Sequence, residues 1–173
     1  MVSEERKTII KKGSESKYLS NCKSPVWPSL KSHGGEVICL MKGLVGLSPT
    51  TLVQLTSYND IQSWDGSQDS WPSLPEQFFE RETVRVLNPM PQRTKNVIPV
   101  EDGRPVYGYR KFIISPNDLS EFVTCSENGI WPRIKSMGAS KELRDIEMPY
   151  RSRRIELTKT TKVNLMTSLD IDH

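Results

Sequence analysis

The side chains that most often carry out catalysis are few in this sequence and far apart. The two histidines are His33, which precedes Gly34-Gly35, and His173, the last residue. A general base must lie within hydrogen-bond reach of the group that it deprotonates. Cys39 is the nucleophile nearest to His33 along the chain, but no acidic residue is placed to orient the histidine, as a catalytic dyad requires. These residues do not predict nucleophilic catalysis.

Metal and nucleotide sites are not indicated either. Structural zinc needs about four closely spaced cysteines or histidines, and the sequence has no such spacing, no GxGxxG and no GxxxxGK[ST] stretch. Four acidic residues could serve a site, but we expect them at strand edges, where a solvated charge is the ordinary case: Glu80, Glu82, Glu101 and Asp102. We therefore expect a protein that is not an enzyme, with no cofactor and no catalytic or metal-binding residue.

Charge is the strongest chemical signal in the chain. Residues 1–31 hold seven basic and three acidic residues, for a net charge of +4, whereas residues 32–80 hold one basic and six acidic residues, for −5. Such asymmetry is typical of a protein that touches phosphate or acidic lipid with one face, and it also fits contact between copies. A solvated, lysine-rich tail without any partner explains the first residues equally well.

Three of the four tryptophans are followed by proline, at Trp27, Trp71 and Trp131. The flanking sequences do not match, so no repeat architecture follows. We expect Trp71 and Trp131 to fill domain edges from loops. Trp27 differs, because it lies in SPVWPSLKSHGG (24–35), where each proline favours an extended predecessor. We predict an extended arm there.

The elements that must position these side chains begin with a strand over 36–47, EVICLMKGLVGL. A helix is predicted next, with Ser48 as N-cap and Pro49 at its first position. It would carry an apolar face with a three-residue period and end at Asp65-Gly66: Leu52, Leu55, Tyr58 and Ile61.

Shorter elements follow. ETVRVL (82–87) alternates as a strand does, and Asp102-Gly103 predicts a hairpin turn within 97–114. Ser115-Pro116 predicts a short helix, which Asn128-Gly129 ends. We expect a further helix over 139–148 and one long strand or two strands over 153–169.

Together these elements predict the α+β class. We expect a single compact domain over 36–173, in which two or three short helices pack on a mainly antiparallel sheet. A disordered basic tail (1–23) and the extended Pro/Trp arm (24–35) would precede it. Three cysteines without a CxxC pair favour a reducing compartment. The longest apolar run, Val37 to Met41, is too short to span a membrane, and the polar start is unlike a secretory signal.

The order of tail, arm, strand, Ser-Pro cap and helix resembles the matrix proteins of rhabdoviruses, particularly those of plant-infecting cytorhabdoviruses. SPTTLVQLTSYNDIQSWDG is similar to their first helix, and RRIELTKTTKVNLMTSL to a late strand of their sheet. The similarity of order spans roughly residues 5–66 and 150–168. The PPxY and P[TS]AP budding signals of animal-virus relatives are absent.

The resemblance implies a non-enzymatic viral structural protein of the virion and host cytoplasm. It would self-associate, condense the ribonucleoprotein through the viral nucleoprotein or RNA, and bind an anionic membrane surface peripherally. In related proteins an extended arm docks on the neighbouring copy. Here that role would fall to Pro25, Val26, Trp27 and Pro28, since aromatic anchors dominate interfaces; the alternative is that Trp27 packs on its own domain. The membrane- or phosphate-binding residues would be Arg6, Lys7, Lys11, Lys12, Lys17, Lys23, Arg151, Arg153 and Arg154.

A second hypothesis is a viral RNA-binding protein, such as a silencing suppressor or a movement-type protein. It needs aromatic side chains on a basic sheet face to stack bases. The residues that could do so are Tyr107, Tyr109 and Phe112, beside Arg110 and Lys111, although Tyr107 and Tyr109 share a face and fit a core equally. A third hypothesis is a cytosolic adaptor domain.

Overall fold

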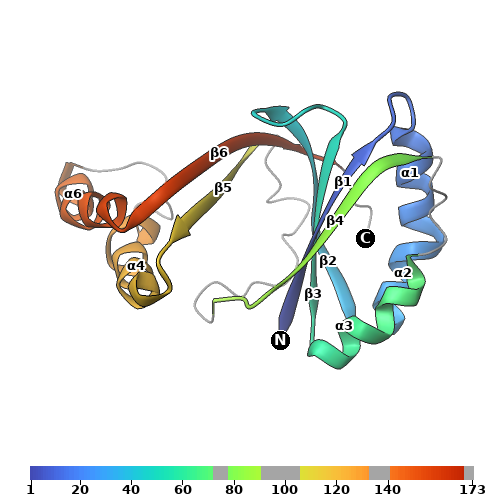
Figure 1. The fold of residues 1–173 in the computed structure, drawn as a ribbon, viewed down its shortest axis with the longest axis horizontal. Coiled ribbons are helices and arrows are strands. Elements are labelled where there is room, and N and C mark those ends of the chain that lie inside the picture. Colours follow the sequence, from blue (N-terminus) through green and yellow to red (C-terminus); the bar gives the residue numbers. More distant parts are fainter. Residues whose placement is uncertain (72–77, 91–105, 133–140, 170–173) are drawn as a thin grey trace. The chain divides into compact units, whose positions relative to one another are not determined.

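The computed structural model describes residues 1–71, 78–90, 106–132 and 141–169 of the chain. Six strands form one sheet in the order β4-β1-β3-β2-β6-β5, and the pairings from β4 to β6 are antiparallel. The elements, shown in Figure 1, are β1 (Val2–Ile10), α1 (Glu15–Asn21), α2 (Trp27–Ser32), β2 (Gly35–Val45), β3 (Thr51–Tyr58), α3 (Ile61–Ser67), β4 (Phe79–Leu87), β5 (Val106–Ile114), α4 (Leu119–Cys125), α6 (Lys141–Glu156) and β6 (Thr158–Ser168).

The first four strands form a ferredoxin-like arrangement. Helices α1 and α2 connect β1 to β2, β2 and β3 form a hairpin, and α3 leads to β4. Because β3 lies between β1 and β2 in the sheet, the connection is the split βαβ type. The predicted α+β class and the mainly antiparallel sheet are therefore confirmed.

The chain forms two compact units. Unit 1 comprises residues 1–109 and 164–173, and unit 2 comprises residues 110–163. In unit 1, the helices α1, α2 and α3 lie on one face of the sheet (Figure 1) and enclose a core with Tyr18, Leu30, Leu40 and Leu52 at its centre. We call this side of the sheet the helix face and the opposite side the second face.

Unit 2 is built from α4, α6 and the chain around them. The rings of Phe112 and Phe122 lie 5.3 Å apart between centroids, and the guanidinium of Arg154 lies over both. Gly129 packs so tightly on Tyr150 that a Cβ added there would lie 2.5 Å from the Tyr150 Cβ. Unit 2 therefore has a small aromatic core of its own.

The predicted disordered tail is wrong for most of its length. Residues 2–10 form β1, which pairs with β3 on one side and β4 on the other, and residues 15–21 form α1. The prediction failed because β1 buries polar side chains. Glu4, Arg6 and Thr8 are at most 3% exposed, and a composition argument counts such residues as solvated. The predicted domain start at residue 36 therefore falls inside unit 1.

The predicted extended arm is also wrong. Residues 22–26 form a kink between α1 and α2, in which Ser24 has an extended backbone and the Ser24-Pro25 bond is cis. Helix α2 begins at Trp27 with Pro28 in its first turn, a position that tolerates proline. The side chain of Trp27 is 9% exposed and belongs to the core of unit 1. The alternative, packing of Trp27 on its own domain, is what the structure has.

The predicted helix over 48–66 is correct only at its end. Ser48-Pro49 starts a turn, closed by a 2.8 Å hydrogen bond from the Thr51 amide to the Ser48 carbonyl, and the next residues form β3. This strand is buried on both faces, so its sequence shows no alternation. Only α3 is helical there, and Asp60, whose carboxylate accepts a 2.7 Å hydrogen bond from the Ser63 amide, caps it.

The remaining predictions are largely confirmed. The strands predicted at 36–47 and 82–87 are β2 and β4, and α4 follows Ser115-Pro116. The helix predicted at 139–148 is longer, because α6 continues to Glu156, and β6 accordingly starts at Thr158 rather than near 153. The turn predicted at Asp102-Gly103 lies outside the described residues.

Candidate functional site: a cationic pocket on the second face of the sheet

Strand β1 supplies polar side chains to both faces of the sheet. Successive side chains of a strand point to opposite faces. Glu4, Arg6 and Thr8 therefore point to the helix face, whereas Glu5 and Lys7 point to the second face. The two sets therefore have different neighbours and different surroundings.

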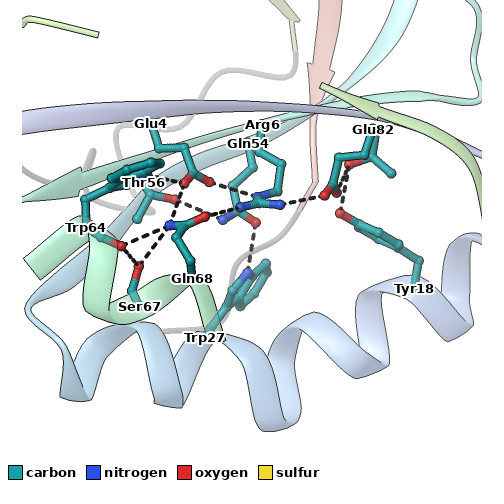
Figure 2. Close-up of polar contacts among 11 residues, drawn as sticks. Glu4, Arg6, Tyr18, Trp27, Gln54, Thr56, Trp64, Ser67, Gln68 and Glu82 are labelled. Carbon is teal, nitrogen blue, oxygen red and sulfur yellow. Dashed lines mark hydrogen bonds and ion pairs between the residues drawn. The ribbon is translucent and has the colours of Figure 1, made fainter. Parts of the chain in front are cut away.

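The Arg6 guanidinium is the centre of a buried polar network on the helix face (Figure 2). Its Nε lies 2.8 Å from Glu4 Oε1, and its Nη1 lies 2.5 Å from Glu82 Oε2. Its Nη2 donates to Gln68 Oε1 at 3.1 Å. The guanidinium also lies 3.8 Å from the centre of the Trp71 ring. Arg6 thus uses its planar fork toward two carboxylates at once.

The remaining carboxylate oxygens of the network are also bonded. Trp64 Nε1 donates to Glu4 Oε2 at 2.7 Å, and Thr8 Oγ1 donates to Glu82 Oε1 at 3.0 Å. The Thr8 hydroxyl lies 3.2 Å from the Tyr18 hydroxyl. Burial raises the pKa of Tyr18 well above its ordinary value, so this phenol stays protonated at neutral pH.

A second branch of the network holds Trp27. Its indole Nε1 donates to Gln54 Oε1 at 2.9 Å, and Gln54 Nε2 donates to Thr56 Oγ1 at 2.9 Å (Figure 2). Tyr18, Trp27 and Trp64 come from α1, α2 and α3, so each helix is bonded to a strand residue. Because the buried charges are bonded inside the protein, we interpret the network as structural.

The second face carries a pocket of about 170 Å³ between β1 and β4. Its lining consists of three pairs of residues that lie opposite each other across the two strands: Glu5 and Arg85, Lys7 and Thr83, Ile9 and Arg81. We call it the cationic pocket. Because the pairs are directly opposite, their side chains leave the sheet within a few ångströms of one another.

Three cations and one carboxylate give the cationic pocket a formal charge of +2. The carboxylate, Glu5, is engaged: Arg85 Nη1 lies 3.2 Å from Glu5 Oε1, and the Tyr109 hydroxyl donates to Glu5 Oε2. Burial, followed by the bond to the Glu5 carboxylate, raises the pKa of Tyr109, which keeps it a donor. Among the described residues the side chains of Lys7 and Arg81 form no ion pair or hydrogen bond.

An apolar cluster flanks the cationic pocket on the same face. Met41, Val53 and Met166 are at most 6% exposed, and Tyr107 and Tyr109 pack against them. Tyr109 therefore joins the apolar cluster to the pocket, because its ring packs in the first and its hydroxyl binds Glu5 of the second. The two tyrosines proposed as an RNA-stacking platform are part of this cluster.

The structure separates the basic residues predicted to bind membrane or phosphate. Lys7 lines the cationic pocket, whereas Arg6, its neighbour, is buried in the network. Lys11, Lys12 and Lys17 are exposed, and Lys23 is half-buried. Within the described residues no helix is long and apolar enough to cross a membrane.

The three arginines predicted in the C-terminal part belong to unit 2. Arg153 donates to both carboxylate oxygens of Glu121, from Nε to Oε1 at 2.5 Å and from Nη2 to Oε2 at 3.0 Å. Its Nη1 donates to Glu156 Oε2 at 3.0 Å. Arg154 is stacked on two phenylalanines, and burial lowers its pKa. Arg151 is exposed, and among the described residues its side chain forms no contact of this kind.

The four residues predicted for self-association do not form one exposed surface. Val26 and Trp27 are buried, whereas Pro25 and Pro28 are exposed. Sequence reasoning missed Arg81 and Arg85 as site residues. Their spacing was the available signal, since residues four apart in a strand lie on one face.

No family model and no curated protein matches this chain. Two solved structures match it over nearly its whole length. A Fusobacterium nucleatum protein, provisionally named a monooxygenase, is 13% identical with a TM-score of 0.62, and the match covers 98% of this chain and 92% of that one. A Lactobacillus acidophilus protein with the same provisional name is 12% identical with a TM-score of 0.59, covering 96% and 93%. At these identities the similarity shows the fold alone.

Proposed function

We propose that this protein binds a ligand through a phosphate monoester group held in the cationic pocket. The observation that carries the proposal is the convergence of Lys7, Arg81 and Arg85 on one small pocket of the sheet. A phosphate monoester carries a charge of about −1.5 to −2 at neutral pH, which matches the formal +2 of the pocket lining. A single carboxylate would leave about half of that charge uncompensated.

The chemistry of the donors supports the same ligand. Arginine presents planar pairs of N–H groups that suit phosphate oxygens, and lysine adds a compact point charge. Thr83 contributes a hydroxyl to the lining. The pocket volume, about 170 Å³, is below the roughly 300–1,000 Å³ of sites that enclose a drug-sized molecule. We therefore expect the pocket to hold the phosphate head and to leave the rest of the ligand outside.

Calorimetric titration of the full chain tests the proposal. The probes are inorganic phosphate, a nucleoside monophosphate, benzoate as a carboxylate without phosphate, and vesicles that contain phosphatidic acid. We expect the phosphate-bearing probes to bind and benzoate not to bind. Vesicle binding that free phosphate displaces would identify a lipid headgroup as the source of the phosphate.

Variants make the test specific to the pocket. Lys7→Gln and Arg81→Gln should each weaken phosphate binding about tenfold or more, because a hydrogen bond to a charged group contributes about 1.5–3 kcal/mol. Lys17→Gln, which removes an exposed lysine of α1 outside the pocket, is the matched control and should bind as the unmodified protein does. Equal phosphate affinity in all four proteins, or none in any, would overturn the proposal.

The other functions stay predictions. The matrix-type function, with peripheral membrane binding and ribonucleoprotein condensation, shares the phosphate chemistry of the pocket, and the vesicle probe tests its membrane part. RNA binding is tested by the same titration with a short single-stranded RNA. We do not transfer monooxygenase activity to this chain, because the similarity to the two bacterial proteins is one of fold.

A further inference from the structure

Strand β4 lies at the edge of the sheet, and the described residues place no strand on its outer side. An edge strand presents unpaired backbone N–H and C=O groups and can pair with another chain. β4 is nine residues long. Three apolar side chains near its C-terminal end are exposed: Val84 (37%), Val86 (42%) and Leu87 (38%). The edge is therefore neither short nor uniformly charged.

We propose that β4 pairs antiparallel with β4 of a second copy of this chain, across a two-fold axis that passes through Val84. Such an axis, perpendicular to the sheet, leaves each residue on the same face in both copies, so the residues that oppose each other are an even number of positions apart. The possible registers are therefore few, and they differ in the charges that they bring together.

The charge pattern of β4 selects one register. An axis at Arg81 or Glu82 places a glutamate of one copy opposite a glutamate of the other. An axis at Thr83 places Arg81 of one copy opposite Arg85 of the other. An axis at Arg85 places Arg85 opposite the same residue of the second copy. Like charges directly opposite each other destabilise a strand pair. Axes before Arg81 or beyond Arg85 leave only a short stretch of β4 paired. The axis at Val84 pairs residues 81–87 of both copies without any like-charged pair.

The same register covers the exposed valines. Val84 and Val86 lie opposite Arg6 and Glu4 of β1, so they share the helix face. With the axis at Val84, the two Val84 side chains oppose each other, at a Cβ separation of about 4.5–5.5 Å for such pairs. Val86 of each copy flanks them. Pairs of β-branched side chains are among those that stabilise neighbouring strands.

On the second face the pairing extends the cationic pocket. Thr83 lies opposite Arg85 of the second copy, so that arginine joins the lining of the first copy's pocket, and the reverse holds by symmetry. Arg85 of one copy and Arg85 of the other are then diagonal neighbours. A bound phosphate would relieve the repulsion between them. This effect on the pocket rests on the proposed phosphate binding, whereas the strand pairing rests on the edge alone. By linkage, phosphate and dimer should favour each other.

Sedimentation velocity of the full chain over a range of concentrations tests the pairing. We expect a concentration-dependent dimer that phosphate strengthens. Val84→Lys places two ammonium groups opposite each other and should abolish the dimer. Val45→Lys changes another exposed valine, 58% exposed on β2, and should leave the dimer intact. Circular dichroism verifies that both variants remain folded.

A cysteine variant tests the register. Val84→Cys should form a disulfide-linked dimer under mild oxidation, because the two residues face each other, whereas Glu80→Cys should not. A monomer at every concentration, a Val84→Lys dimer, or equal cross-linking of both cysteine variants would overturn the pairing. Phosphate binding by a protein that stays monomeric at every concentration would refute the pairing and keep the proposed function, whereas a dimer that binds no phosphate would do the opposite.

Discussion

At the scale of the residue, Trp27 is part of the core, although the prolines that flank it predict an extended arm. Its indole fills the core of unit 1 and donates to Gln54, which is 1% exposed. We expect Trp27→Ala to lower the free energy of unfolding by about 3–5 kcal/mol, as truncation of a buried aromatic does. Trp27→Phe keeps most of the volume but leaves the Gln54 oxygen without its donor, so it should cost about 1–3 kcal/mol. Urea unfolding followed by circular dichroism measures both.

Lys31→Ala is the control for Trp27, because Lys31 is an exposed residue of the same helix. Its effect on stability should stay within about 0.5 kcal/mol. A Trp27→Ala protein as stable as the Lys31→Ala protein would show that the indole does not hold the core. That outcome would restore the prediction of an arm that docks on a neighbouring copy.

At the scale of the element, β1 places two consecutive cations in different environments, because Arg6 lies in the buried network and Lys7 lines the cationic pocket. Arg6→Met should destabilise the protein by about 3–5 kcal/mol, because it leaves the carboxylates of Glu4 and Glu82 buried beside no cation. Lys7→Met removes a cation of the pocket and should change stability by about 0.5 kcal/mol or less, while phosphate binding weakens. Urea unfolding and calorimetry of the two variants give the comparison. If both variants lose similar stability, the alternation of β1 assigned here is wrong.

Strands β2 and β4 and helix α4 could be predicted from the sequence because their local patterns agree with their surroundings. β4 alternates between charged and apolar residues, and α4 follows a Ser-Pro start. β1 and β3 could not be predicted. The core-facing side of β1 is polar, and β3 is buried on both faces, so neither has the pattern of a half-exposed strand. The three-residue recurrence of Leu52, Leu55 and Tyr58 in β3 instead predicts a helix face.

At the scale of the whole molecule, the cationic pocket depends on pairing between residues that are distant in sequence. The sequence shows the positive charges of Lys7 and of the basic segment that begins at Arg81. Their proximity depends on β1 lying next to β4, a consequence of the strand order and not of any local signal. The buried network has the same origin, because Glu82 meets Arg6 through that pairing. Composition alone therefore could not distinguish a paired cation from one that lines a pocket.

The folded molecule also buries acidic groups that ionise at high pH. Burial raises the pKa of Cys22 to about 12, that of Cys39 to about 11 and that of Tyr58 to about 12. In the unfolded chain, cysteine ionises near pH 8.5 and tyrosine near pH 10. All three residues belong to unit 1. Between about pH 8.5 and 12 the folded state therefore holds more protons than the unfolded state.

Because the folded state holds the extra protons, its stability must fall as the pH rises through that range. Cys22 alone should remove roughly 2 kcal/mol between pH 7 and pH 10. Urea unfolding at both pH values, followed by tryptophan fluorescence, measures the loss. A Trp131→Phe background limits the signal to Trp27, Trp64 and Trp71 of unit 1. Cys22→Ala should start from a lower stability at pH 7, because of the cavity, yet lose less between pH 7 and pH 10. Equal losses in the two proteins would contradict the assignment of the alkaline instability to this buried thiol.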